Sequence, residues 1–182
     1  GGRALVLTTS YAAMRRFAEH LRVAKPYKVL MQGEVSKRQL LAEFSEDETS
    51  VLVATMGFWE GIDVPGPSLS LVVLDKIPFT RPNDPLNQAR REAVEARGLS
   101  AFDMVDLPRA AMLMAQGAGR LIRGETDRGV VAVLDQRLVA KRYGLRIIRT
   151  MPDFVRTTER RRAIQFLEDL VGTAEAGVNQ TV

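Results

Sequence analysis

Short apolar runs alternate with helix-like stretches along almost the whole of this 182-residue sequence. Runs of this length, bounded by polar residues, are typical of strands that are buried on both faces of a sheet. Parallel strands need a crossover segment between them, usually a helix. The alternation therefore predicts an α/β fold in three layers, with a mainly parallel central sheet flanked by helices. The predicted strands span residues 4–8, 28–31, 50–54, 69–74 and 129–134.

Polar capping residues mark where helices begin between these strands. Ser10 is expected to cap a helix that ends near residue 21, and Ser36 one that ends near residue 44. Further helices are predicted over residues 85–97, 108–123 and 152–170. We expect one domain over residues 1–171, a helical, proline-rich insert at about 78–107, and a flexible tail of small and polar residues over 172–182.

Composition excludes several classes of site. The chain has no cysteine, which rules out a disulfide scaffold, a thiol nucleophile and cysteine-ligated metal within it. Its single histidine, His20, argues against a multi-histidine metal site, so no metal-ligating residue is predicted. No apolar run is long enough to span a membrane, and the first residues lack the layout of a signal peptide. We expect a cytoplasmic protein with no membrane partner.

The charge balance permits a polyanionic partner without requiring one. The formal net charge is +4, and most of the 26 basic residues are Arg, which binds phosphate through a two-pronged guanidinium. A complete ATPase of the common type would also carry a glycine-rich loop that ends in Lys-Ser or Lys-Thr. The sequence contains no such loop. A nucleotide site within this chain is therefore incomplete.

The first informative segment is residues 55–66, TMGFWEGIDVPG, directly after the predicted strand over 50–54. Parallel sheets bind ligands at the carboxyl ends of their strands, where this segment begins. Its glycines allow a ligand to approach the backbone, and Asp63 is able to accept hydrogen bonds from ribose hydroxyls. The adjacent rings of Phe58 and Trp59 fit two roles, stacking on nucleobases or packing into the core.

The second informative segment is residues 116–123, QGAGRLIR. On a helix, Gln116, Arg120 and Arg123 would share one face. Such a stripe suits a polyphosphate, whose developing charge the guanidiniums neutralise; the alternative is a solvated basic face of an amphipathic helix. Gly117 and Gly119 would each destabilise a helix by about 1 kcal/mol relative to Ala, which indicates a close backbone contact at this point.

These two segments resemble motifs V and VI of the second motor domain of superfamily-two helicases of the XPD/DinG family, on the bacterial DinG side. Residues 7–11, LTTSY, resemble motif IV, and residues 74–79, LDKIPF, resemble the strand and loop after motif V. The match continues through TDRG at 126–129 and DQR at 135–137, and covers roughly residues 4–170. The resemblance implies a RecA-like fold and one half of a two-domain ATP motor.

The resemblance also implies roles at a nucleotide site shared between two domains. Arg123 is the first choice for an arginine finger and Arg120 is its neighbour, while Gln116 would link nucleotide state to domain closure. The residues expected beside the nucleotide are Glu60, Gly61, Asp63 and Gly119. ATP and Mg²⁺ would be held together with an N-terminal motor domain. A family iron–sulfur cluster, where present, belongs to that other domain and not to this chain.

On the same basis, part of the chain is expected to face single-stranded or forked DNA. The residues implied are Ser10, Tyr11, Gln32, Thr55, Phe58 and Trp59. Contacts to phosphates carry little sequence information, so binding would be nearly independent of sequence and sensitive to salt. The resemblance also implies translocation 5′ to 3′ on single-stranded DNA and a bacterial protein associated with the nucleoid. Residues 78–107 are either a DNA-guiding insert or a helical decoration.

Two other functions are alternatives to a motor domain that is inactive on its own. One is a stand-alone nucleic-acid-binding RecA-like module without ATPase activity. The stripe of Gln116, Arg120 and Arg123 favours the motor, since a pure binding module has no need of an arginine finger. The other is a nuclease, for which the sequence offers no clustered carboxylates of a two-metal site.

Overall fold

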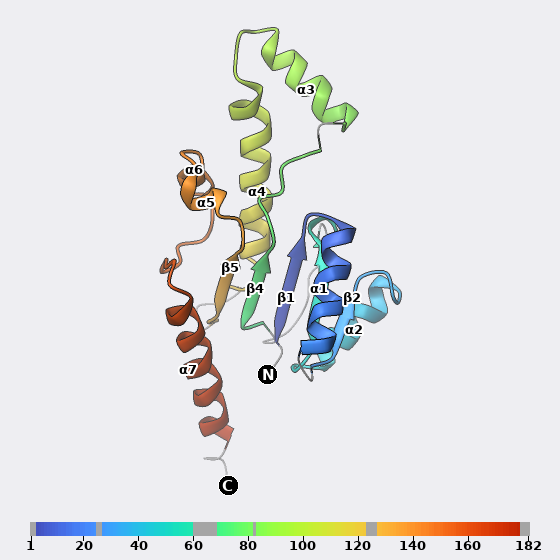
Figure 1. Cartoon of the computed structure of the whole chain (residues 1–182), viewed down its shortest axis with the longest axis vertical. Coiled ribbons are helices and arrows are strands. Elements are labelled where there is room, and N and C mark those ends of the chain that lie inside the picture. The colour runs from blue at the N-terminus through green and yellow to red at the C-terminus, as the bar shows by residue number, and fades with distance from the viewer. Residues whose placement is uncertain (1–2, 25–26, 60–68, 82, 123–126, 179–182) are drawn as a thin grey trace.

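The computed structural model describes residues 3–24, 27–59, 69–81, 83–122 and 127–178, and the side chains of these residues except those of Trp59 and 171–178. Five strands and seven helices alternate along the described chain (Figure 1). The sequence predicted the five strands and five of these helices. A 3₁₀ turn covers Met56–Trp59 and a π-helical turn covers Phe102–Asp106. The strands and helices are β1 (Ala4–Thr8), α1 (Tyr11–Ala24), β2 (Val29–Met31), α2 (Lys37–Glu46), β3 (Val51–Thr55), β4 (Leu71–Leu74), α3 (Pro85–Glu95), α4 (Leu107–Ala118), β5 (Val130–Val133), α5 (Arg137–Ala140), α6 (Gly144–Ile148) and α7 (Arg160–Val178).

All five strands form one parallel sheet in the order β2-β3-β1-β4-β5. β1 lies at its centre, where Ala4 pairs with Val51 of β3 on one side and with Leu71 of β4 on the other. The parallel sheet confirms the prediction made from the apolar runs. Because every strand runs in the same direction, the segments that follow the strands meet at one edge of the sheet.

Alternate side chains of β1 pack into two separate hydrophobic clusters, one on each face of the sheet. Leu5 and Leu7 belong to a cluster with side chains of α2 and α4, whereas Ala4 and Val6 belong to a cluster with Met14 of α1. This is the period of two that a strand imposes on its side chains. Helices therefore cover both faces, α1 on one and α2 and α4 on the other, which confirms the predicted three layers (Figure 1).

The two predicted helix caps are present. Ser10 Oγ accepts a hydrogen bond of 3.2 Å from the Ala13 amide, and Ser36 Oγ accepts one of 3.3 Å from the Gln39 amide. Each satisfies one of the amides that the first turn of a helix leaves unpaired. α1 therefore begins directly after the carboxyl end of β1.

α4 is shorter at its C-terminal end than the helix predicted over residues 108–123. It ends at Ala118, and the Gly119 amide closes the last turn on the Ala115 carbonyl at 2.8 Å. The close contact expected at the glycines is present at Gly117, where a Cβ would lie 3.0 Å from Leu74 Cδ2. A side chain at position 117 would require the side chain of Leu74 to shift.

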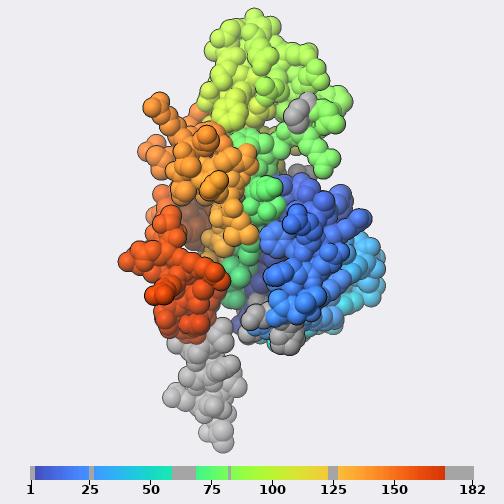
Figure 2. Space-filling model, in the orientation of Figure 1, coloured from blue at the N-terminus to red at the C-terminus, as the bar shows by residue number. Residues whose placement is uncertain are grey.

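The helix α3 is attached to the rest of the molecule mainly through polar contacts. Among its residues only Asn87 is buried, and its side-chain amide donates to Asp106 at 3.1 Å. Arg91 forms an ion pair with the same carboxylate. α3 and the beginning of α4 make a helical hairpin that rises beyond the carboxyl edge of the sheet (Figures 1 and 2). The insert expected at about 78–107 corresponds to this hairpin.

The C-terminal part differs from its predicted layout. Residues 137–149 form the two short helices α5 and α6, which the sequence pattern did not indicate. Residues 152–159 have no regular structure, and α7 begins only at Arg160. α7 then continues to Val178, past residue 172, at which the flexible tail was expected to begin. Within the described ranges, no helix is long and apolar enough to cross a membrane.

Candidate functional site

A pocket of about 250 Å³ lies at the carboxyl edge of the sheet. Three segments that follow neighbouring strands build it: the one after β1, the one after β3 and the loop after β4. This is the edge at which open parallel sheets bind their ligands. Its lining residues are Thr8, Thr9, Ser10, Tyr11, Thr55, Met56, Gly57, Pro78, Phe79 and Arg81. The structure thus brings together Ser10, Tyr11 and Thr55, which sequence reasoning selected from two separate motifs.

The wall after β1 presents hydroxyl groups at the start of α1. Thr8 is fully buried, and its hydroxyl donates to the Ser10 carbonyl at 3.1 Å. Ser10 Oγ is the acceptor of the α1 cap, so its own hydrogen is left to point at a ligand. Tyr11 is 56% exposed. A helix N-terminus with hydroxyls beside it favours an anion.

Gln32 holds the end of β3 in place. Its Oε1 accepts two hydrogen bonds from Thr55, at 2.8 Å from the backbone amide and at 3.0 Å from the hydroxyl. Because a backbone amide only donates, the carboxamide oxygen must face Thr55, and the Nε2 group points toward the Tyr11 hydroxyl, 3.5 Å away. The Thr55 hydroxyl hydrogen is therefore used in its bond to Gln32. Gln32 Nε2 is the group that can donate a hydrogen bond to a ligand beside Thr55 and Tyr11.

The loop after β4 forms a wall that sequence reasoning missed. Pro78, Phe79 and Arg81 line the pocket, although no site residue was predicted in this segment. Two signals were available: the segment follows a predicted strand, and its residues 74–79 resemble the strand and loop after motif V. Arg81 brings a cationic side chain to the pocket, which is otherwise lined by neutral groups.

Asp135, at the end of β5, fixes the backbone of this loop. Its Oδ2 accepts a 3.0 Å hydrogen bond from the Ile77 amide, and the Arg137 guanidinium donates to both carboxylate oxygens. The hydrogen bonds from Arg137, followed by the one from Ile77, lower the pKa of Asp135 to about 2. The carboxylate is therefore charged across the physiological range, and it ties β5 to the loop that lines the pocket.

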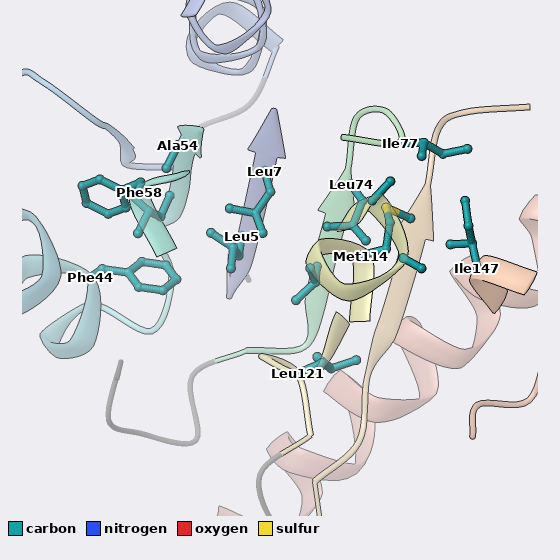
Figure 3. Close-up of a cluster of buried hydrophobic side chains, with 14 of the residues drawn as sticks. Leu5, Leu7, Phe44, Ala54, Phe58, Leu74, Ile77, Met114, Leu121 and Ile147 are labelled. Carbon is teal, nitrogen blue, oxygen red and sulfur yellow. The ribbon is translucent and has the colours of Figure 1, made fainter. Parts of the chain in front are cut away.

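Phe58 does not face the pocket. Its ring is 7% exposed and lies in the core cluster with Phe44 and Ala54 (Figure 3). The ammonium group of Lys37 lies 5.2 Å from the ring centroid. Of the two roles open to this ring in the sequence, the structure supports packing, because a covered ring has no face for a nucleobase. The side chain of Trp59 lies outside the described residues.

The second predicted motif lies next to the first. A Cβ on Gly117 would come within 3.5 Å of Met56 Cε, so the end of α4 touches a residue that lines the pocket. Gln116 is exposed on the last turn of α4, whereas Gly119 and Arg120 follow the helix in a turn. Gln116 and Arg120 therefore do not share one helical face, contrary to the expectation for this segment. The predicted site residues that lie outside the described residues are Glu60, Gly61, Asp63 and Arg123.

Chemically, the pocket combines hydrogen-bond donors with one cation. The Ser10 hydroxyl and the Arg81 guanidinium of the lining, and Gln32 Nε2 next to the lining residues Thr55 and Tyr11, are all suited to phosphate oxygens. In the part of the chain that the structure describes, no group of three or more His, Cys, Asp or Glu side chains is placed to hold a metal ion. The arrangement suits binding of a phosphodiester better than chemistry on it.

Comparison with known proteins gives a consistent result. The family model described as "Helicase C-terminal domain" matches residues 1–154. The chain is 47% identical over 168 residues to the ATP-dependent DNA helicase YoaA of Haemophilus influenzae, covering 92% of this chain and 26% of that protein. It is 49% identical over 158 residues to the ATP-dependent helicase DinG of Mycobacterium tuberculosis, covering 87% of this chain and 24% of that protein.

A solved apo structure of XPD superposes with a TM-score of 0.63 at 24% sequence identity, covering 81% of this chain and 31% of the XPD chain. This likeness supports the fold, which is the RecA-like α/β arrangement expected from the motifs. The chain spans about a quarter of the length of the curated relatives that it matches.

Proposed function

The chain belongs to the helicase C-terminal domain family of the XPD/DinG type, and from this premise we propose that it is the second motor domain of an ATP-dependent DNA helicase. In this proposal the domain binds single-stranded DNA at the carboxyl edge of its sheet. It also contributes side chains to a nucleotide site that an N-terminal RecA-like domain completes. Cycles of domain closure and opening move the strand, 5′ to 3′ as the family resemblance implies.

The observation that carries the proposal is the meeting of the two motifs at one place. The pocket built from the motif IV and motif V segments shares Met56 with the end of α4, where motif VI begins. A donor-rich pocket for a phosphodiester and the start of a polyphosphate-binding segment thus lie in direct contact. A bound strand and a bound nucleotide would therefore contact neighbouring residues at the carboxyl edge of the sheet.

On the nucleotide side, the proposal uses the donors that follow α4. Arg123 is assigned the arginine finger, Arg120 stands beside it, and exposed Gln116 senses domain closure. The remaining residues assigned to the nucleotide are Glu60, Gly61, Asp63 and Gly119. ATP with Mg²⁺ supplies the hydrolysable phosphoanhydride. The fit rests on the chemistry of the side chains: Gln and Arg donate to phosphate oxygens, while carboxylate ligands for Mg²⁺ would come from the N-terminal domain.

On the DNA side, the donor pattern separates the roles of Gln32 and Thr55. The Thr55 hydroxyl donates to Gln32, so it has no hydrogen for a phosphate, whereas Gln32 Nε2 does. Gln32→Glu keeps both hydrogen bonds from Thr55 but replaces the donor by a negative oxygen. We expect Gln32→Glu to weaken single-strand binding by at least about tenfold. Thr55→Val should change it by less than about threefold.

Fluorescence anisotropy of a labelled oligothymidine, titrated with the full-length protein over a series of salt concentrations, measures both effects. Gln39→Glu makes the same change of charge on α2, away from the pocket lining, and should bind like the wild type. A Thr55→Val defect as large as that of Gln32→Glu would contradict the donor assignment. A wild-type protein without single-strand affinity would contradict the proposed function itself.

A further inference from the structure

The loop after β4 places an aromatic ring on the wall of the pocket. Phe79 is partly buried, and it lines the pocket together with Pro78 and Arg81. Phe79 and Tyr11 are the two aromatic residues that line the pocket, and Phe79 is the one held by other rings, whereas Phe58 lies covered in the core. If the phosphates of a single strand lie against the hydroxyl groups that follow β1, its bases can stack on flat apolar side chains nearby.

Two further rings from distant parts of the sequence hold Phe79 in this position. The centroid of Phe79 lies 5.6 Å from that of Phe102 and 5.8 Å from that of Tyr143, and the latter ring stands nearly perpendicular to it at 87°. Phe102 and Tyr143 lie 5.3 Å apart, so the three rings form a closed aromatic cluster. Aromatic pairs at such separations are mutually stabilising.

An ion pair between Asp135 and Arg137, called the charged bracket below, contacts the same ring from the β5 side. Arg137 places its guanidinium 5.6 Å from the Phe79 centroid, and Asp135 binds that guanidinium as well as the Ile77 amide, two residues before Phe79. Asp135 is 9% exposed, which is unusual for a carboxylate without a role. The bracket therefore fixes both the backbone and the ring of the loop that lines the pocket.

We propose that one nucleobase of the bound strand stacks on Phe79, and that Asp135 is the positioning residue that holds Phe79 in place. This inference rests on the proposed function. Stacking on an aromatic side chain is tolerant of base identity, because every base has a π face. It adds affinity for bases without adding sequence preference, as a translocating motor requires. Asp135 acts only through Ile77 and Arg137 and does not touch the strand.

The test compares two ligands of equal backbone charge. Full-length protein is titrated against an oligothymidine and against the same strand built of abasic deoxyribose-phosphate units. The wild type should prefer the strand with bases. Phe79→Leu, which keeps apolar bulk but lacks the flat face, should reduce that preference by about fivefold to a hundredfold while abasic binding stays within twofold. Phe79→Trp should retain the preference, and Phe166→Leu on α7 is the matched control.

Asp135 is tested by the same ratio of affinities. Asp135→Asn should reduce the preference for bases, and combined with Phe79→Leu it should add no further loss, because both changes act on one ring. Equal weakening of both ligands in either variant would indicate a merely structural role and overturn the proposal. Wild-type protein that binds both strands equally would also overturn it. Protein that binds neither strand would instead refute the proposed function.

A second measurement does not depend on the folding of the variants. Wild-type protein bound to a strand carrying 5-iododeoxyuridine is irradiated, and the cross-linked peptide is identified by mass spectrometry. The proposal expects a cross-link in the tryptic peptide that begins at Ile77 and contains Phe79. Cross-links confined to other peptides would contradict it.

Discussion

Replacing Arg123 with alanine in the full-length protein is expected to lower single-strand-stimulated ATP turnover by about a thousandfold, with DNA binding retained. An arginine finger stabilises charge on the phosphoryl group only as the reaction proceeds, and such a finger contributes about 10³–10⁵ in rate. The loss should therefore fall on kcat rather than on the KM for ATP. Steady-state ATPase assays at saturating oligothymidine measure it.

The control for this prediction is an arginine on α4. Arg109→Ala removes an exposed guanidinium at the beginning of α4, at the other end of the helix from motif VI, and should change turnover by less than about twofold. If Arg123→Ala turns over ATP like the wild type, the arginine-finger role would be assigned to Arg120 instead. Arg120→Ala then tests that assignment. Wild-type turnover in both variants would contradict the nucleotide role proposed for this segment.

The second large effect is expected on stability, from Gly144→Ala. A Cβ at position 144 would lie 1.9 Å from the Leu138 carbonyl oxygen and 2.6 Å from its carbon, so the backbone of α5 or α6 has to move. Overpacking against backbone of this kind should cost about 3 kcal/mol of unfolding free energy. For a chain of this size the melting temperature would then fall by about 6–12 °C.

Thermal unfolding followed by circular dichroism measures this loss against a matched glycine. Nothing lies within 4 Å of a Cβ built on Gly57, so Gly57→Ala should melt within about 2 °C of the wild type. A Gly144→Ala protein that melts like the wild type would show that α5 and α6 do not pack as described.

Local features of this fold were predictable because their causes are local. The five strands followed from short apolar runs, and the caps at Ser10 and Ser36 followed from one side chain reaching an amide three residues later. The order of the strands is set by contacts between distant segments, which no periodicity reveals. The early end of α4 at Ala118 reflects Gly119, whose weak helix propensity leaves the next residues to a tighter turn.

Part of the site was predictable because the ends of parallel strands lie at the same edge of a sheet. Ser10, Tyr11 and Thr55 meet because their segments follow neighbouring parallel strands. It was not predictable that Phe79 lines the pocket while Phe58 is covered, because burial depends on which helix packs over each segment. The bracket from Asp135 to Ile77 joins residues 58 positions apart in sequence, which sequence spacing does not indicate.

The central claim is that this chain is one half of a nucleotide site, and ATP hydrolysis tests it most directly. Purified 182-residue chain and full-length protein are assayed side by side, each with and without single-stranded DNA. The account predicts DNA-stimulated turnover by the full-length protein and none above background by the chain alone. Robust turnover by the chain alone, or no stimulated turnover by a full-length protein that binds DNA, would contradict it; the second result would instead support a stand-alone binding module.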